Sequence, residues 1–258
     1  MSWYEAWFDS DAYEVVYQNR NLADARRLLD LIERVAAPTP DAALLDVACG
    51  RGRHARLLAQ RGYDVTGLDL SENAIATARK RAKQEGLSER VRFMVGDMRL
   101  PHFQRRFDGV VNLFTSFGYF ADEADHARAV SAMAQALKPG GFLVQDFLNA
   151  SYVRQHLVPR DVRTLDGIDV TQERWIAEDA PGGPRVEKRI TLCCFELDEA
   201  EGIAAEDHVF TESVRLLTRD DIAALYDAAG LTLLNAYGTY DGAPHTPDSP
   251  RLILHARA

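Results

Sequence analysis

The chain has 258 residues, a hydrophobic fraction of 47% and a formal net charge of -9. This length supports a substantial core, and one domain with an insertion is the natural interpretation. The acidic charge disfavours nucleic acid and anionic membranes as partners, and there is no apolar run of about 18 residues that would span a membrane. The 3 cysteines form neither a disulfide framework nor a zinc-type cluster, so we expect no metal. The N-terminus lacks a signal peptide's basic start and apolar core, which favours a cytoplasmic location.

The first predicted element is a helix over residues 3–36, which precedes the proline-containing segment 37–42. Leu28, Leu29 and Ile32 recur at helical spacing, so this helix is expected to pack on a sheet. Pro38 then ends it.

The next segment joins a short apolar run, residues 43–47, to a glycine turn and a second helical pattern. Gly50 and Gly52 have no Cβ, so a ligand can approach their backbone, and the following helix directs amide donors to the same place. Gly50-x-Gly52-x-x-Ala55 also fits a dinucleotide fingerprint, with Asp69 near the spacing of a ribose-binding acid. The segment therefore predicts a nucleotide-binding site, but the glycine turn does not identify which nucleotide binds there.

Asp46 argues against NAD, because a carboxylate at the end of this strand suits a cationic ligand group instead. Asp46 followed by Ala48-Cys49-Gly50-x-Gly52 resembles the first motif of the class I S-adenosylmethionine-dependent methyltransferases. The resemblance implies an α/β fold: a Rossmann-like seven-stranded sheet with helices on both faces. It also implies S-adenosylmethionine as cofactor, with S-adenosylhomocysteine as product, and a cofactor contact at Ala48.

Two further predicted strands lead to an aspartate that suits this cofactor: the strand 64–69 ends in Asp69, and the strand 91–95 is followed by Gly96 and Asp97. In the family an acid at the position of Asp69 holds the ribose hydroxyls, with Leu70 beside it; the alternative is a helix N-cap. Asp97 and Met98 resemble the adenine-binding step, although a Gly-Asp turn is also common.

The fourth predicted strand, residues 107–114, runs into the aromatic segment 112–120. Apolar rings near a sulfonium stabilise it by cation–π contact and exclude water, while packing in the core explains some of them. The resemblance assigns Asn112, Leu113 and Phe114 to the cofactor, and Tyr119 is a candidate for the acceptor side.

Near the N-terminus, Tyr13-Glu14-Val15-Val16-Tyr17-x-x-Arg20 is similar to a segment of small-molecule methyltransferases whose aromatic residues cover the cofactor. Tyr17 and Arg20 are accordingly predicted at the cofactor and Tyr13 at the acceptor. The alternative is that Tyr13 and Tyr17, four residues apart, are packing residues of an amphipathic helix.

After a fifth predicted strand, residues 142–148, the pattern changes from alternating strand and helix to a meander. Strands are predicted at 169–176, 185–197 and 208–217, with turns at 181–184 and 199–204. We therefore expect an N-terminal helical cap (1–42), a methyltransferase core (43–148 and 218–258) and an inserted antiparallel subdomain (149–217). The insertion is expected to roof the acceptor pocket or to form a homodimer contact.

A helix from Thr218 and two strands, residues 231–240 and 251–257, complete the chain. If the first of these strands runs parallel to the others, the loop before Arg251 emerges on the ligand face. His245 in that loop is the first candidate for a general base, since histidine titrates near neutrality; a solvated loop histidine is the alternative. Tyr119, Asp146 and His208 are further candidates for this base. The remaining residues predicted to bind the acceptor are Asp146, His208, Tyr240 and Arg251.

These patterns predict methyl transfer from S-adenosylmethionine to an oxygen or nitrogen atom of a small-molecule acceptor. Two alternatives stay open: a non-catalytic cofactor-binding regulatory module, and an NAD-dependent oxidoreductase. Nucleic-acid methylation is disfavoured by the charge and by Asn112-Leu113-Phe114-Thr115, which lacks the Pro-Pro-Tyr pattern of many amino methyltransferases.

Overall fold

The computed structural model describes residues 2–17, 22–193 and 207–258. Its centre is a sheet of seven strands in the order β10-β11-β5-β4-β1-β2-β3. The strands are β1 (Ala43–Val47), β2 (Asp64–Asp69), β3 (Val91–Val95), β4 (Phe107–Asn112), β5 (Leu137–Leu148), β10 (Thr232–Tyr237) and β11 (Arg251–Arg257). Strand β11 runs antiparallel to both β5 and β10, so β10 is parallel to the rest. The predicted fold class is confirmed.

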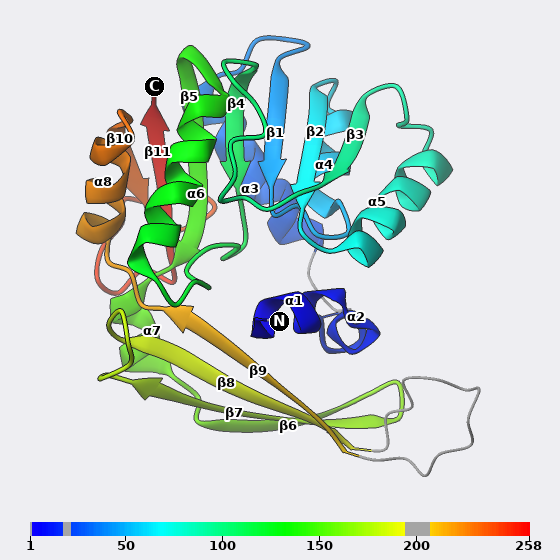
Figure 1. The fold of residues 1–258 in the computed structure, drawn as a ribbon, viewed down its shortest axis with the longest axis vertical. Coiled ribbons are helices and arrows are strands. Elements are labelled where there is room, and N and C mark those ends of the chain that lie inside the picture. The colour runs from blue at the N-terminus through cyan, green and yellow to red at the C-terminus, as the bar shows by residue number, and fades with distance from the viewer. Residues whose placement is uncertain (1, 18–21, 194–206) are drawn as a thin grey trace.

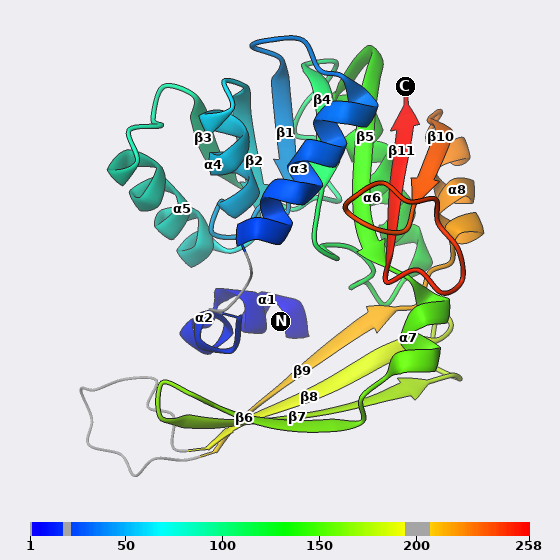
Figure 2. The ribbon, with the colours of Figure 1, turned by 180° about the vertical axis from the view of Figure 1, so that it is seen from behind.

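Helices cover both faces of this sheet. On one face lie α3 (Leu22–Ala36), α4 (Arg53–Gln60) and α5 (Glu72–Gln84), which share one apolar core with the strands (Figure 2). On the other lie α6 (Glu123–Ala136) and α8 (Arg219–Ala228), which build a second core (Figure 1). Among the described residues, no helix combines the length and apolar character that crossing a membrane would need.

The N-terminal segment differs from the single helix predicted over 3–36. It forms α1 (Trp3–Asp9), α2 (Asp11–Tyr17) and α3, and α1 ends at Ser10, whose backbone is extended. Residues 18–21 lie outside the described part of the chain. Helices α1 and α2 sit below the sheet, between its lower edge and the inserted strands (Figure 1).

The insertion is an antiparallel sheet of four strands in the order β6-β7-β8-β9, as the predicted meander requires. These are β6 (Arg160–Leu165), β7 (Ile168–Ala177), β8 (Arg185–Cys193) and β9 (His208–Arg215), preceded by α7 (Ala150–His156). Strand β6 was not predicted, and neither was α7. The predicted residues 194–197 and the turn 199–204 lie outside the described residues.

The glycine turn after β1 is shaped by packing on its inner side. Gly52 has a φ of 73°, and a Cβ there would lie 2.7 Å from Cζ of Phe93 and 3.0 Å from Cβ of Ala78. Gly86 has nearly the same φ, 71°, but nothing within 4 Å of such a Cβ. Gly52 therefore serves close packing as well as the left-handed turn.

This contrast predicts that Gly52→Ala destabilises the fold more than Gly86→Ala. Both substitutions strain a left-handed backbone, but only the first overpacks the core, which costs about 1–3 kcal/mol in addition. Urea unfolding of the two variants measures the difference in the free energy of unfolding. Equal losses would contradict the packing role of Gly52.

Candidate active site

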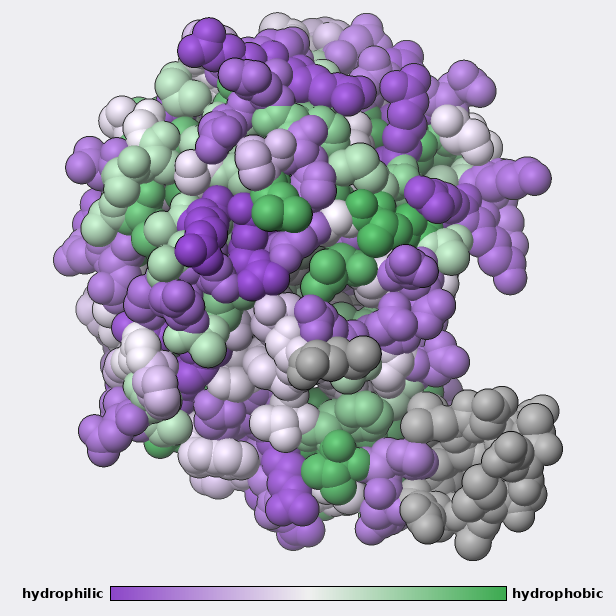
Figure 3. Space-filling view, viewed as in Figure 1, coloured by the Kyte–Doolittle hydropathy of each residue, from purple (hydrophilic) through white to green (hydrophobic). Residues whose placement is uncertain are grey.

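A cavity of about 1070 Å³ lies between the carboxyl ends of β1 to β4, helices α1 and α2, and the inner face of the inserted sheet. The surface is hollowed between the α/β body and this sheet, and apolar side chains gather around the hollow (Figure 3). Ligand pockets commonly measure about 300–1,000 Å³, so this cavity has room for a cofactor and an acceptor together.

Asp69 ends β2 and lines the cavity beside the glycine turn. Its Oδ2 accepts the Gly50 N–H at 2.7 Å, and its Oδ1 accepts the Ser71 N–H at 3.0 Å. A Cβ built on Gly50 would meet nothing within 4 Å, so the backbone there is open to a ligand. Burial raises the pKa of Asp69, while these two amides act against the rise. The carboxylate is thereby held rigidly at the cavity wall.

Asp46 lies one strand away, in β1, and is 1% exposed. Burial and the neighbouring charge of Asp69 raise the pKa of Asp46 to about 7. Its Oδ2 is buried without a hydrogen-bond partner among the described residues. Two close carboxylates, one with an unsatisfied oxygen, form a site that a positively charged ligand group would stabilise.

Asp97 follows β3, the next strand along the sheet, and also lines the cavity. Arg99 Nη2 donates to its Oδ2 at 2.5 Å, and the Arg99 backbone N–H donates to its Oδ1 at 2.9 Å. Partial burial would raise the pKa of Asp97, but the contacts with Arg99 hold that pKa below its ordinary value. Asp97 is thus an ionised acceptor at this edge of the cavity.

Helices α1 and α2 are anchored to the core beside these aspartates. Asp9 Oδ1 accepts the Ser71 hydroxyl at 2.5 Å, and its Oδ2 accepts Asn73 Nδ2 at 2.9 Å. Glu14 pairs with Arg51, at 3.2 Å, and with Arg81. These anchors were not predicted from the sequence, since nothing local marks Asp9 or Glu14 as a partner of the glycine turn or of α5.

The same helices are also tied to the inserted sheet. Glu212 Oε1 accepts Trp7 Nε1 at 2.7 Å and the Tyr17 hydroxyl at 2.6 Å, and its Oε2 accepts Lys188 Nζ at 2.6 Å. Burial would raise the pKa of Glu212, but Lys188 and these donors hold that pKa below its ordinary value. The N-terminal helices therefore link the two halves of the cavity.

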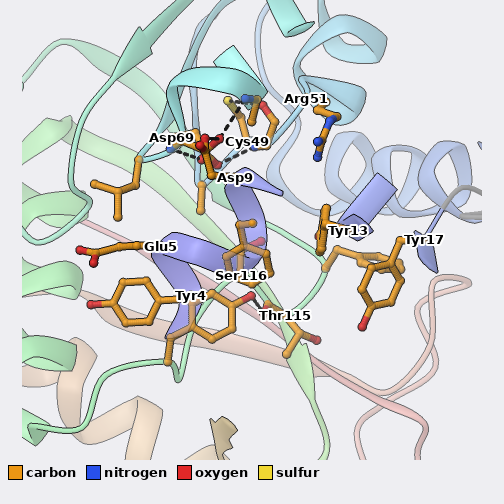
Figure 4. A pocket seen from close by; sticks show the side chains of 18 of the residues that line it. Tyr4, Glu5, Asp9, Tyr13, Tyr17, Cys49, Arg51, Asp69, Thr115 and Ser116 are labelled. Carbon is orange, nitrogen blue, oxygen red and sulfur yellow. Dashed lines mark hydrogen bonds between the residues drawn. The ribbon is translucent and has the colours of Figure 1, made fainter. Parts of the chain in front are cut away.

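An aromatic wall completes the cavity on the side of α1. The Tyr119 ring lies 5.4 Å from Trp3, 6.2 Å from Tyr4 and 5.2 Å from Phe8, measured between ring centroids. All four residues line the cavity, and Figure 4 shows Tyr4 facing it. Such a wall excludes water and offers ring faces to a cation.

Most residues predicted at the cofactor line this cavity, whereas most predicted at the acceptor do not. The lining contains Tyr13, Tyr17, Ala48, Gly50, Asp69, Leu70, Asp97, Met98, Leu113, Phe114 and Tyr119. It does not contain Asp46, Gly52, Asn112, Asp146, His208, Tyr240, His245 or Arg251. Arg20 lies outside the described residues.

The C-terminal loop follows β10 at the expected edge but packs beside α3. Arg27 Nη2 donates to Asp241 Oδ2 at 2.5 Å, and Arg34 Nη2 donates to the Asp241 carbonyl at 2.7 Å. Burial and the charge of Arg219, the first residue of α8, lower the pKa of His245. In this arrangement His245 does not reach the cavity lining.

Comparison with known proteins gives the same family as the geometry. Residues 44–141 match the model of a methyltransferase domain. The chain is 37% identical over 227 residues to a dTDP-3-amino-3,6-dideoxy-alpha-D-glucopyranose N,N-dimethyltransferase of Streptomyces fradiae, which covers 87% of this chain and 84% of the relative. It is 34% identical over 163 residues to a dTDP-3-amino-3,4,6-trideoxy-alpha-D-glucopyranose N,N-dimethyltransferase of Streptomyces venezuelae, covering 60% of this chain and 66% of the relative.

Among solved structures, the amino pentose methyltransferase CalS10 of Micromonospora echinaspora superposes with a TM-score of 0.68 at 27% identity, covering 96% of both chains. Of the two cofactors considered, NAD and S-adenosylmethionine, these matches favour S-adenosylmethionine, in agreement with the sheet order and the cavity. The chain belongs to the S-adenosylmethionine-dependent methyltransferases, of the type that methylates small molecules.

Proposed function

We propose that this enzyme transfers methyl groups from S-adenosylmethionine to the amino nitrogen of a nucleotide-linked amino sugar. The observation that carries this proposal is the similarity to the Streptomyces fradiae amino-sugar N,N-dimethyltransferase, which extends over 87% of this chain. The matched length exceeds the cofactor-binding domain, so it includes segments that border the acceptor side of the cavity.

The three aspartates fit the chemistry of the cofactor. We assign Asp69 to the ribose hydroxyls, since both of its oxygens are fixed by backbone amides. Asp97, held ionised by Arg99, accepts from the adenine amine. Asp46 lies behind the cavity lining, one strand from Asp69, and the negative charge of its unsatisfied oxygen there suits the positive charge of the methionine portion. Gly50 lets the cofactor approach the backbone, and Leu70 and Met98 flank the adenine.

The reaction needs little beyond orientation. When bound, S-adenosylmethionine would supply an electrophilic methyl group, and the residues around the cavity would hold it in line with the lone pair of the acceptor's amine, so orientation would supply most of the catalysis. The methylated amine would form as an ammonium and would lose one proton to solvent or to a base. The amine must be neutral when it attacks, and a general base helps where it is protonated. Tyr119 remains our candidate for a polar contact with the acceptor because it lines the cavity; His245 remains an untested candidate base.

We assign the inserted segment, residues 149–217, to the roof of the acceptor pocket, and residues 1–42 to a cap over the cofactor. Val186, Lys188, Glu212 and Val214 of the insertion line the cavity, which favours the roof over a purely dimer-forming role. The core is then residues 43–148 with 218–258.

A matched pair of acceptors tests the proposal. We expect a dTDP-linked 3-amino sugar to gain one or two methyl groups, detected by mass spectrometry together with S-adenosylhomocysteine. The same nucleotide sugar with a hydroxyl at that carbon should react at least about 100-fold more slowly, because a neutral hydroxyl is the poorer nucleophile. Equal rates, or reaction of the hydroxyl compound alone, would contradict N-methylation.

A further inference from the structure

Two consecutive residues in the cavity wall have a backbone conformation that their side chains disfavour. Phe114 has a φ of 61° and Thr115 a φ of 63°, two and three residues after β4 ends at Asn112. Left-handed backbone is uncommon outside glycine, and for a β-branched residue such as Thr115 it is an outlier. Such strain persists only where the surroundings hold it, and it gathers at functional sites.

The groups that hold this pair come from β5, from β11 and from the loop between β10 and β11. Asp146 Oδ2 accepts the Phe114 N–H at 3.0 Å, and the Asp146 carbonyl accepts the Thr115 N–H at 2.9 Å. Arg251 Nη2 donates to Thr115 Oγ1 at 3.0 Å, and its Nε donates to Asp146 Oδ1 at 2.8 Å. Tyr240 donates its hydroxyl to Asp146 Oδ2 at 3.1 Å.

These three side chains stand behind the wall. Asp146 is fully buried, and Asp146, Tyr240 and Arg251 are all absent from the cavity lining, whereas Phe114 and Thr115 belong to it. Among the described residues, the hydrogen-bond partners of the Asp146 carboxylate are all donors, so both of its oxygens are satisfied without a ligand. Any effect of the cluster on the reaction therefore passes through the loop.

Arg251 also fixes the aromatic ring of that loop. The guanidinium carbon of Arg53 lies 4.7 Å from the centroid of the Phe114 ring, and that of Arg251 lies 5.9 Å from it. The backbone of both residues, the Thr115 hydroxyl and the Phe114 ring are thus restrained by the ion pair of buried Asp146 with partly exposed Arg251, together with Arg53.

We propose that Asp146, Arg251 and Tyr240 are positioning residues for methyl transfer, which hold Phe114 and Thr115 in the geometry that aligns the acceptor with the sulfonium methyl. Their role is distinct from ligand contact and does not depend on which acceptor is used. Small misplacements of a wall residue cost rate rather than cofactor affinity, because in-line attack tolerates little displacement.

The test compares Arg251→Met and Arg251→Lys with a control at the opposite end of the sheet. There, Asp108 Oδ2 accepts the Ala43 N–H at 2.9 Å, and Lys138 Nζ donates to Asp108 Oδ1 at 2.7 Å, so Lys138→Met removes a comparable carboxylate partner. We expect kcat in Arg251→Met to fall about 100-fold, with the Kd for S-adenosylmethionine changed less than about threefold. Arg251→Lys should recover part of kcat, and Lys138→Met should keep it.

A second measurement needs no acceptor, so its result tests the positioning role even if the proposed amino-sugar acceptor is wrong. Amide hydrogen exchange at Phe114 and Thr115 should become about tenfold faster or more in Arg251→Met and stay unchanged in Lys138→Met. Unchanged exchange and kcat in folded Arg251→Met would overturn the proposal. An equal loss of kcat in Lys138→Met would also overturn it, as would a loss of cofactor affinity in Arg251→Met with kcat unchanged.

Discussion

Asp69→Ala is expected to raise the Kd for S-adenosylmethionine by about 100-fold or more. The substitution removes the acceptor proposed for two ribose hydroxyls, and a hydrogen bond to a charged group contributes about 1.5–3 kcal/mol, with about 1.4 kcal/mol per tenfold in affinity. It also frees the Gly50 N–H, which Asp69 holds at 2.7 Å. Isothermal titration calorimetry measures the loss.

Asp64→Ala is the matched control for this prediction. Asp64 is an aspartate at the other end of the same strand, β2, where its exposed side chain lies 3.4 Å from Arg90. Surface ion pairs contribute about 0–1 kcal/mol, so this variant should bind the cofactor as the native enzyme does. A similar Kd for both variants would remove Asp69 from the cofactor site.

Asp46→Asn is expected to have opposite effects on stability and on cofactor binding. The folded-state pKa of Asp46 is raised from 3.8 to about 7. A raised pKa means that the folded state binds the proton more tightly than the unfolded state, so the bound proton stabilises the fold. This contribution to the free energy of unfolding is complete below about pH 4 and disappears as the pH rises through about 7. At pH 8 the unliganded variant, which lacks the buried charge, should be more stable than the native protein by up to about 4 kcal/mol, because each unit of the rise in pKa corresponds to about 1.4 kcal/mol.

Cofactor binding should change in the other direction. At pH 7.5 the variant lacks the carboxylate proposed to face the cationic methionine portion, and its Kd should be about tenfold higher than that of the native enzyme. At pH 5 Asp46 is protonated in the native protein, so the two Kd values should converge. Thermal unfolding without ligand and calorimetry at both pH values measure these effects. A variant that is less stable at pH 8, or a Kd ratio independent of pH, would contradict the assignment.

The sheet and its cofactor edge were predictable because their signals are local. Each core strand is a short apolar run, and Asp46, Asp69 and Asp97 each stand at or just after the end of one, so alternation of strand and helix brings them to one edge. Gly50 and Gly52 were predictable for the same reason, because both belong to one turn that can be recognised from neighbouring residues. The resemblance to a family then added the identity of the ligand.

The rest of the site depends on contacts between distant residues. Asp146 and Arg251 are 105 positions apart, and Trp7 and Glu212 are 205 apart, so no local pattern predicts either pair. Strand β6 was missed because its side chains are mostly exposed and charged, which removes the alternation that marks a half-buried strand. The topology of β10 was anticipated. The ion pair of Asp241 with Arg27 and the hydrogen bond from Arg34 to the Asp241 carbonyl, which hold the loop beside α3, were not.

A crystal structure of the enzyme with S-adenosylhomocysteine tests the central claim most directly. We expect one nucleoside in the cavity above Gly50, with its ribose hydroxyls on Asp69, its adenine amine at Asp97 and its amino-acid portion on the side of Asp46. A nucleoside bound elsewhere, or bound here without contact to Asp69 and Asp97, would contradict this account of the site.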